Sequence, residues 1–295
     1  MHKNLRDIIK DAEKCGITIG HFNISNLEQL KAIAHVAQKL DVPAIIGVSE
    51  GERDYLGLHH VKDLVDSYNK EHGKADGNFW LFLNADHTHT VDGIKKAAAV
   101  GFDAVIFDGG KLPIDENIKL TKEAVESAKK LNPKVIVEGE LGNIGTSSEI
   151  RKEIPKGAAI RPEDLTTPED TARFVRETGV DLLAPAVGNI HGMFTDAPEP
   201  ALDIPRIKAI REAAGVPLVL HGGSGNTDAE FLGAINAGVV IIHISTELRV
   251  AWRKGIEESL KELPEEIAPY KLVPHAMEDM ERVIEQRLKL FNKLN

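Results

Sequence analysis

The sequence has little of what would place a protein in a membrane, outside the cell or on nucleic acid. Its single cysteine, Cys15, excludes an internal disulfide framework and any cysteine-rich zinc module. No apolar run approaches the roughly 18–20 residues of a membrane-spanning helix, and residues 1–9 mix charged with apolar side chains, unlike a secretory signal. Lys and Arg number 36 against 46 Asp and Glu, and this net charge of −10 opposes general binding to nucleic acid or anionic membranes. We therefore expect a cytoplasmic protein whose ligand is a small molecule, which a locally positive pocket can still bind as an anion.

The chain also lacks a Gly-x-Gly-x-x-Gly motif after its first strand-like run, which argues against an open dinucleotide-binding sheet. It contains instead eight short, continuous apolar runs that alternate with amphipathic stretches, the pattern of a parallel sheet covered on both faces. Eight such units without a second composition regime predict an α/β protein built as a single (β/α)₈ TIM barrel. The predicted strands are 17–24, 44–49, 79–84, 104–108, 135–139, 182–187, 217–220 and 239–245. The predicted helices include 27–40, 61–71, 118–131, 168–178, 203–214 and 228–237.

Three segments add to this pattern. Residues 5–14 predict an extra helix before the first strand, and residues 266–294 predict a helical C-terminal extension. We therefore expect one domain over 1–295, with the barrel at about 15–255 and the extension at about 256–295. The segment 141–164 is rich in Gly, Ser and charge and has no clear periodicity, so it is either a lid over the active site or a passive surface excursion.

Polar side chains gather where the predicted strands end, which is where TIM barrels carry their chemistry. Three imidazoles with carboxylates on one rim suit a divalent cation such as zinc, with a position left open for substrate. The alternative is a hydrogen-bonded polar ring that only closes the barrel mouth. Asp86 and His87 are adjacent, so we expect their side chains to diverge, one towards a metal and the other towards substrate. The strand-end set comprises His21, His87, His191, His221, His243, Asp86, Asp108, Glu138 and Glu140.

A glycine-rich turn, His221-Gly222-Gly223-Ser224-Gly225, follows the seventh predicted strand. Glycines there let backbone N–H groups approach a ligand, and Ser224 adds a hydroxyl. The loop after the seventh strand commonly binds phosphate in such barrels, together with the loop after the eighth. Ser245 and Thr246 open the helix that follows the eighth strand, and a helix N-terminus also favours an anion.

Motifs along the chain resemble those of the class II, metal-dependent fructose- and tagatose-bisphosphate aldolases, over roughly residues 15–255. They are Gly20-His21-Phe22-Asn23-Ile24, Val48-Ser49-Glu50-Gly51, Asn84-Ala85-Asp86-His87, Asp108-Gly109-Gly110, Val137-Glu138-Gly139-Glu140-Leu141-Gly142, Ala186-Val187-Gly188-Asn189-Ile190-His191-Gly192, His221-Gly222-Gly223-Ser224-Gly225 and Ile244-Ser245-Thr246-Glu247. In this order and spacing the set is specific for the superfamily and less specific for the substrate.

The resemblance assigns a role to each matching residue. It implies that His87, His191 and His221 bind a catalytic zinc, which cobalt or another divalent ion would replace. Glu140 matches the carboxylate of a second position of that ion, and Asp86 matches the acid/base at the substrate C4 hydroxyl. Loops for phosphate and a monovalent cation (Na⁺ or K⁺) match Gly192, Gly222, Gly223, Ser224, Ser245 and Thr246. Asn23 and Ser49 match positions that touch the distal part of the substrate in relatives.

This set suits the chemistry. Cleavage of the C3–C4 bond of a ketose leaves a carbanion beside a carbonyl, and zinc stabilises the resulting enediolate as a Lewis acid. A Schiff-base route would need a lysine at a strand end, and none stands there. Asp86 would take the C4 hydroxyl proton and return it in condensation.

The chain departs from the family at several positions. The loop acid/base usually lies where this chain has Ser148, so we take Glu149, one residue later, as the candidate. His243 replaces the asparagine that orients the substrate, and His21 replaces a small residue. The lysine common after the His191-Gly192 pair is missing from 193–196. The two extra imidazoles either alter the substrate or anion site, or simply fill space and hydrogen-bond each other.

We predict a metal-dependent aldolase of carbohydrate metabolism and glycolysis that reversibly splits a phosphorylated ketose into dihydroxyacetone phosphate and an aldehyde. Fructose 1,6-bisphosphate is the first choice of substrate and tagatose 1,6-bisphosphate the second. A metal-dependent sugar epimerase and a non-catalytic aldolase-related subunit are the alternatives. The resemblance implies a homodimer or homotetramer, with the C-terminal helices as plausible interface elements.

Overall fold

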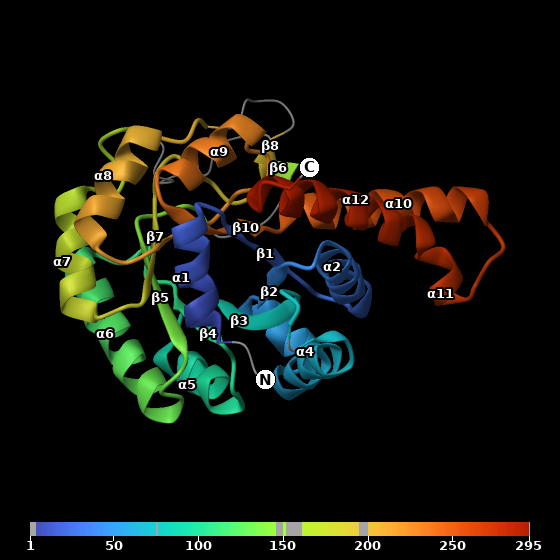
Figure 1. The fold of residues 1–295 in the computed structure, drawn as a ribbon, viewed down its shortest axis with the longest axis horizontal. Coiled ribbons are helices and arrows are strands. Elements are labelled where there is room, and N and C mark those ends of the chain that lie inside the picture. Colours follow the sequence, from blue (N-terminus) through green and yellow to red (C-terminus); the bar gives the residue numbers. More distant parts are fainter. Residues whose placement is uncertain (1–3, 75, 146–149, 152–160, 195–199, 295) are drawn as a thin grey trace.

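The computed structural model describes residues 4–74, 76–145, 150–151, 161–194 and 200–294. Eight parallel strands close into a barrel, in which each strand pairs with its neighbour in chain order and β10 returns to β1 (Figure 1). This confirms the predicted (β/α)₈ class. The barrel strands are β1 (Ile19–Asn23), β2 (Pro43–Val48), β3 (Trp80–Thr88), β4 (Ala104–Phe107), β5 (Ile136–Leu141), β7 (Leu182–Pro185), β9 (Leu218–Leu220) and β10 (Val239–Ile244).

The helices form a ring around the barrel. Their bounds are α1 (Leu5–Cys15), α2 (Leu27–Leu40), α3 (Glu50–Leu56), α4 (Leu58–His72), α5 (Val91–Val100), α6 (Ile114–Leu131), α7 (Pro168–Thr178), α8 (Ile204–Ala214), α9 (Asp228–Asn236), α10 (Thr246–Glu262), α11 (Pro269–Leu272) and α12 (Pro274–Phe291). Local sequence explains several ends. Thr167 caps α7 through its side chain, Pro168 opens the helix, and Gly179 ends it in the left-handed region at φ 71°. None of the helices in the described ranges is both long and apolar enough to cross a membrane.

The amino-terminal end of the barrel is closed by α1. Leu5, Ile9 and Ala12 of this helix are buried and belong to one apolar cluster with inward-facing barrel residues that include Ile45 and Phe82. Because apolar packing fills this end, polar chemistry is confined to the opposite end, where the strands terminate at their carboxyl ends.

The C-terminal helices complete the barrel wall. The long helix α10 projects from the barrel, and α12 runs back beside it and packs against α2, α9 and β1 (Figure 1). A Cβ at Gly255 would lie 2.4 Å from backbone atoms of Ala276, so glycine allows α10 and α12 to approach closely. The barrel-to-extension boundary expected near residue 256 falls inside α10, because this helix continues unbroken past the barrel.

A second, two-stranded parallel sheet lies outside the barrel. In it β6 (Ile150–Arg151) pairs with β8 (Met193–Phe194), which joins the segment after β5 to the segment after β7. The predicted lid at 141–164 is described only in part, so its two interpretations stay predictions.

Candidate metal centre and active site

The residues singled out from the sequence lie at the carboxyl-terminal mouth of the barrel, but two strands extend further than predicted. Strand β3 continues to Thr88 and β5 to Leu141, so Asp86, His87 and the two glutamates of β5 lie within strands rather than after them. The pairing of each strand with its neighbours carries it past the apolar run that marks it in the sequence.

An irregularity in β3 brings Asp86 and His87 to the same pocket. His87 has φ 39°, a conformation that non-glycine residues rarely adopt, and the pairing of β3 with β4 shifts register between Ala85 and Thr88. The expectation that the two side chains diverge is wrong, because a left-handed residue breaks the alternation of the strand. His87 Nε2 lies 3.8 Å from Asp86 Oδ1.

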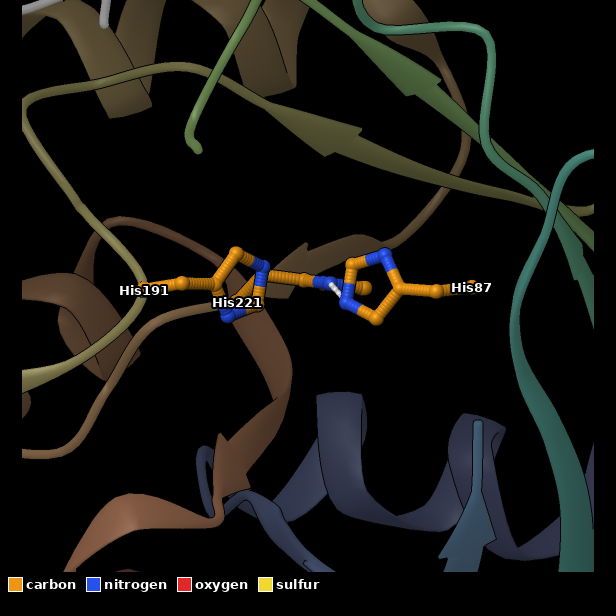
Figure 2. A group of neighbouring side chains, drawn as sticks. All are labelled: His87, His191 and His221. Atoms are coloured by element: carbon orange, nitrogen blue, oxygen red, sulfur yellow. Dashed lines mark hydrogen bonds between the residues drawn. The ribbon is translucent and has the colours of Figure 1, made fainter. Parts of the chain in front are cut away.

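Three imidazoles converge at this mouth from three separate segments. His87 comes from β3, His191 from the loop after β7, and His221 from the residue that follows β9 (Figure 2). Their ring centroids lie 4.6, 4.9 and 5.8 Å apart, and all three pairs of rings are nearly perpendicular. The Nδ1 atom of His221 lies 3.3 Å from Nε2 of His87. Two nitrogens bound to one tetrahedral zinc at 2.0–2.1 Å would lie about 3.4 Å apart, so this spacing fits a shared ion.

The outer nitrogens of two of these rings are held by buried carboxylates. His87 Nδ1 lies 2.9 Å from Asp108 Oδ2, and His221 Nε2 lies 2.7 Å from Glu138 Oε1. A carboxylate that accepts the outer N–H sets the tautomer and aims the lone pair of the inner nitrogen, as it does in metal sites. The lone pairs of His87 Nε2 and His221 Nδ1 then face each other, and that arrangement requires a cation between these two nitrogens.

A proton can be that cation when no metal is bound. Burial by itself lowers the pKa of His87, but the carboxylates of Asp86, Asp108 and Glu140 outweigh burial and raise this pKa to about 10. For His191, burial and the two neighbouring imidazoles lower the pKa well below its ordinary value. The donor set and the surrounding negative charge therefore fit a divalent cation that displaces a proton.

Glu140 lies beside this cluster. Its Oε2 atom is 3.7 Å from Nδ1 of His87 and 3.8 Å from Nδ1 of His221, and the side chain is buried. Burial and the neighbouring carboxylate of Asp108 raise the pKa of Glu140 well above its ordinary value. His87, Asp108 and Glu140 also form a group whose ligand atoms lie within 4.8 Å of one another. The second position of the metal ion that we expect at Glu140 would lie at this group.

Asp86 is oriented by a chain of polar contacts. Asn23 Nδ2 donates to Asp86 Oδ2 at 2.8 Å and to Glu52 Oε2 at 3.0 Å. Burial would raise the pKa of Asp86, but the imidazoles of His87, His21 and His221, with the Asn23 hydrogen bond, hold this pKa below its usual range. The carboxylate is therefore ionised, and its Oδ1 atom has no hydrogen-bond partner among the described residues.

A cavity of about 280 Å³ opens over these residues. It is lined by Asn23, Ser49, Glu50, Gly51, Asp86, His87, His89, His191, Gly192, Gly222, Ser224, His243, Ser245, Thr246 and Arg249. This list contains every predicted substrate-binding residue except Gly223. The N–H of Gly223 instead donates to the His243 carbonyl at 3.1 Å, which ties the β9 loop to β10.

The two anion loops are joined by Ser224. Its hydroxyl accepts from the N–H groups of Ser245 and Glu247 at 3.2 and 3.3 Å, at the start of α10. Gly222 has φ 59°, and a Cβ there would lie 2.5 Å from the Ile190 carbonyl oxygen, so the loop carrying His191 can approach only a glycine. The Ser245 hydroxyl lines the cavity and has no hydrogen-bond partner within the described part of the chain.

Sequence reasoning assigned no role to three charged residues around the cavity. Arg249 of α10 is the one Lys or Arg among the described lining residues, and its Nη2 donates to Glu52 at 2.7 Å. Arg53 is buried beneath β3 and donates to the carbonyl oxygen of Asp86 and the hydroxyl of Thr88, both at 3.0 Å. Glu52 and Arg53 lie on α3, a helix that the sequence did not predict. The rotation of α10 sets the direction of Arg249, and the sequence does not carry that information.

The two additional imidazoles stack on each other. His21 and His243 have ring centroids 3.4 Å apart with planes 5° apart, and His243 also stacks on His221 at 3.9 Å. This stacking agrees with the expectation that the two imidazoles fill space. The expected hydrogen bond between them is wrong, because rings that lie face to face do not hydrogen-bond each other. His21 Nε2 instead pairs with the amide of Asn84 at 3.0 Å.

One predicted catalytic residue, Glu149, lies outside the described residues. Its role therefore stays a prediction.

The structure is therefore that of a closed parallel (β/α)₈ barrel with a candidate metal centre. Three converging imidazoles and buried carboxylates form this centre at the mouth of the barrel. The model of the family described as fructose-bisphosphate aldolase class-II matches residues 3–295. A 6-phospho-5-dehydro-2-deoxy-D-gluconate aldolase of Shouchella clausii is 35% identical over 289 residues, which cover 98% of this chain and 94% of that protein. A fructose-bisphosphate aldolase of Geobacillus stearothermophilus is 32% identical over 275 residues, 92% of this chain and 90% of that protein.

Solved structures agree with these relatives. The crystal structure of the YdjI aldolase from Escherichia coli K12 superimposes with a TM-score of 0.80 at 28% identity, covering 99% of this chain and 97% of that one. The chain belongs to the class-II fructose-bisphosphate aldolase family. It is an aldolase, a carbon–carbon lyase, and this membership argues against a non-catalytic subunit.

Proposed function

We propose that the protein is a zinc-dependent aldolase that reversibly cleaves a ketose 1,6-bisphosphate, fructose 1,6-bisphosphate first and tagatose 1,6-bisphosphate second, to dihydroxyacetone phosphate and an aldehyde. The observation that carries this proposal is the inner pair of imidazole nitrogens, 3.3 Å apart, with each outer nitrogen held by a carboxylate. His87, His191 and His221 would hold the ion. When bound, zinc acts as a Lewis acid that stabilises the negative charge developed by C3–C4 cleavage.

Asp86 accepts the proton of the C4 hydroxyl during cleavage and returns it during condensation. Its Oδ2 atom is held by Asn23, which leaves Oδ1 directed towards the imidazole cluster, 3.8 Å from His87 Nε2. A carboxylate fixed in this way holds the base at the reacting hydroxyl without reorganisation. Glu149 is our candidate for exchanging the C3 proton of dihydroxyacetone phosphate, and Glu140 for a second position of the ion.

The phosphate of the dihydroxyacetone portion binds to the loop at Gly222 and Ser224 and to the start of α10. The unpaired Ser245 hydroxyl, together with Thr246 at the first turn of that helix, supports this assignment. Gly192 lines the same cavity, and a monovalent cation (Na⁺ or K⁺) would lie beside these loops. Arg249, the lining cation, is positioned for the anionic end of the aldehyde portion, near Asn23 and Ser49.

A second substrate is favoured by Arg249, the one Lys or Arg among the described residues that line the cavity. The relative from Shouchella clausii is named for 6-phospho-5-dehydro-2-deoxy-D-gluconate, a ketose with one phosphate and a carboxylate at its other end. Cleavage between its C3 and C4 atoms also releases dihydroxyacetone phosphate. One guanidinium, Arg249, can pair a carboxylate bidentately, so this acid would need no second phosphate loop.

A coupled assay for dihydroxyacetone phosphate tests the function. The zinc-loaded protein is offered the two ketose bisphosphates, the phosphorylated gluconate and unphosphorylated ketoses. We expect dihydroxyacetone phosphate from at least one phosphorylated ketose and none from the free sugars. Chelation with EDTA should abolish release, and zinc or cobalt should restore it. Full activity after verified metal removal would exclude the mechanism, and formation of only an isomeric hexose would indicate the epimerase.

A further inference from the structure

Two carboxylates line the active-site cavity, and the proposed reaction uses only one of them. Asp86 is the base, and Glu50, the first residue of α3, is the other acid among the described lining residues. Glu50 belongs to neither the metal ligands nor the phosphate loops of the proposed function. An acidic side chain on the wall of a cavity that binds phosphate calls for a reason, because it repels the anionic groups of the substrate.

The carboxylate of Glu50 is fixed from one side. Its Oε1 atom accepts a hydrogen bond from the N–H of His89 at 3.1 Å, which ties the start of α3 to the loop after β3. The side chain is partly exposed, and it forms no ion pair with a Lys or Arg in the part of the chain that the structure describes. A carboxylate held in this way is a hydrogen-bond acceptor that a ligand in the cavity can reach.

The start of α3 borders open space. A Cβ built on Gly51, which follows Glu50 and also lines the cavity, would meet no atom of the described residues within 4 Å. A Cβ at Gly222 in the phosphate loop would instead lie 2.5 Å from a carbonyl oxygen. A group of the substrate therefore has room beside Glu50.

The contacts of α3 indicate which part of the substrate lies there. Glu52, one residue beyond Gly51 on the same helix, accepts from Asn23, and Asn23 also holds Asp86, the base at C4. The other oxygen of Glu52 pairs with Arg249, the group that the proposed function assigns to the anionic end at C6. Because C5 is the carbon between these two anchors, its hydroxyl is the group that α3 borders.

We propose that Glu50 accepts a hydrogen bond from the hydroxyl at C5 of the ketose and so selects substrates that carry this hydroxyl. This inference rests on the proposed function, because the place of C5 follows from the roles of Asp86 and Arg249. A site built to hydrogen-bond a hydroxyl discriminates against an analogue that lacks it, since its own polar group is then left unpaired. A carboxylate also disfavours a second carboxylate close to it.

The proposal separates the two kinds of substrate that the cavity could take. Fructose and tagatose 1,6-bisphosphate both have a hydroxyl at C5. In 6-phospho-5-dehydro-2-deoxy-D-gluconate, carbon 2 becomes the fifth carbon when the chain is counted from its phosphate end, and the name states that its hydroxyl is missing. Glu50 would find no partner on that acid and would lie close to its carboxylate. We therefore expect the ketose bisphosphates to be the better substrates.

Aldol condensation measures this preference as a ratio. The zinc-loaded protein is given dihydroxyacetone phosphate with either glyceraldehyde 3-phosphate or 3-oxopropyl phosphate, which lacks only the hydroxyl that becomes the C5 hydroxyl of the product. We expect kcat/KM to be about 10-fold higher for the hydroxylated aldehyde, as for one hydrogen bond to a charged group. Because both aldehydes carry the same phosphate, the ratio cancels the effect of charge.

Variants at Glu50 show whether this residue produces the ratio. Glu50→Ala should bring the two aldehydes to equal kcat/KM, whereas Glu50→Gln, which keeps an acceptor oxygen for the His89 N–H and for the hydroxyl, should give an intermediate ratio. Glu123→Gln, at an exposed position of α6, is the control and should keep the ratio of the unchanged protein. Equal rates in the unchanged protein, or an unaltered ratio in Glu50→Ala, would overturn the role of Glu50 and leave the aldolase function intact.

Calorimetry separates failure of this proposal from failure of the proposed function. Glucitol 1,6-bisphosphate has no carbonyl group, so it binds without being cleaved. We expect the unchanged protein to bind it about 10-fold more tightly than its 5-deoxy analogue, and Glu50→Ala to bind both equally. This difference in affinity without any condensation would refute the proposed function and leave the hydroxyl site at Glu50 intact. Equal affinities in the unchanged protein, or binding of neither compound, would refute the site.

Discussion

At the scale of single residues, the proposed reaction depends on how the neighbours of one carboxylate hold it. Asp86 accepts a hydrogen bond from Asn23, and Asn23 is in turn anchored on Glu52, whose other oxygen pairs with Arg249. This chain of contacts joins the base to Arg249, which also lines the cavity. A change at either end can therefore alter the geometry at the reacting carbon without touching the metal.

The Asp86→Ala substitution tests the role of the base. It removes the proton acceptor but none of the three imidazoles, so kcat should fall by about 10²–10⁴-fold. The ion bound by His87, His191 and His221 should remain, as measured by metal analysis at one equivalent of zinc. Turnover within a few-fold of the unchanged protein would contradict the role of Asp86.

A second residue-scale prediction concerns the carboxylate behind His221. Glu138 accepts from His221 Nε2 at 2.7 Å, and burial raises its pKa although the histidine opposes this. Glu138→Gln removes the charge that strengthens this ligand, so zinc affinity should fall by about 10–100-fold. Glu123→Gln, at an exposed position of α6, is the matched control. Competition titration with a chromophoric chelator measures both, and equal affinities would argue against an ion at His221.

At the scale of elements, the short helix α3 supports the irregular end of β3. Arg53 extends from this helix and donates to the carbonyl oxygens of Val48 and Asp86 and to the hydroxyl of Thr88. These contacts stabilise the turn at His87, where φ is 39°. A helix outside the barrel thereby sets the direction of the base and of one metal ligand.

Arg53→Met should show this coupling. Loss of hydrogen bonds from a buried guanidinium should lower the free energy of unfolding by about 1.5–3 kcal/mol and should also reduce kcat, because β3 loses its support. The matched control is Arg253→Met, on the exposed face of α10, where a change below about 0.5 kcal/mol is expected. Urea unfolding and the aldol-cleavage assay would report the two effects. A stability loss with unchanged kcat would separate Arg53 from the site.

At the scale of the whole molecule, the projecting α10–α12 pair leaves apolar side chains in solvent. Ile267 is 90% exposed and Tyr270 73% exposed, and Leu260 and Leu263 lie nearby in the chain. Apolar groups gathered on a projection are typical of an interface between subunits. They support the homodimer or homotetramer that the family resemblance implies.

Light scattering coupled to size-exclusion chromatography tests this assembly. We expect a dimer or tetramer for the unchanged protein and a shift towards the monomer for Ile267→Asp, because a buried charge without a partner destabilises an interface. Glu258→Asp, a conservative change on α10, is the control. A monomer of the unchanged protein at micromolar concentrations would contradict the prediction.

The sequence alone was sufficient for the barrel and for the set of histidines that gather at its mouth. Helices α2 and α7 have the predicted bounds, since amphipathic period, caps and terminal glycine are local signals. Three of the predicted strand-end histidines meet in one group because the carboxyl ends of all barrel strands share one rim. The short strands β6 and β8 were missed, since two residues carry no periodic pattern.

Tertiary structure alone decided where those side chains point. The left-handed turn at His87 and the reach of Arg53 beneath it depend on contacts between segments more than thirty residues apart, which no local pattern records. The stacking of His21 on His243 depends on the register between the first and last barrel strands, which exists only once the barrel closes. Residue type is a local property of the chain, whereas a ligand geometry is a set of distances between strands, so it appears only after folding.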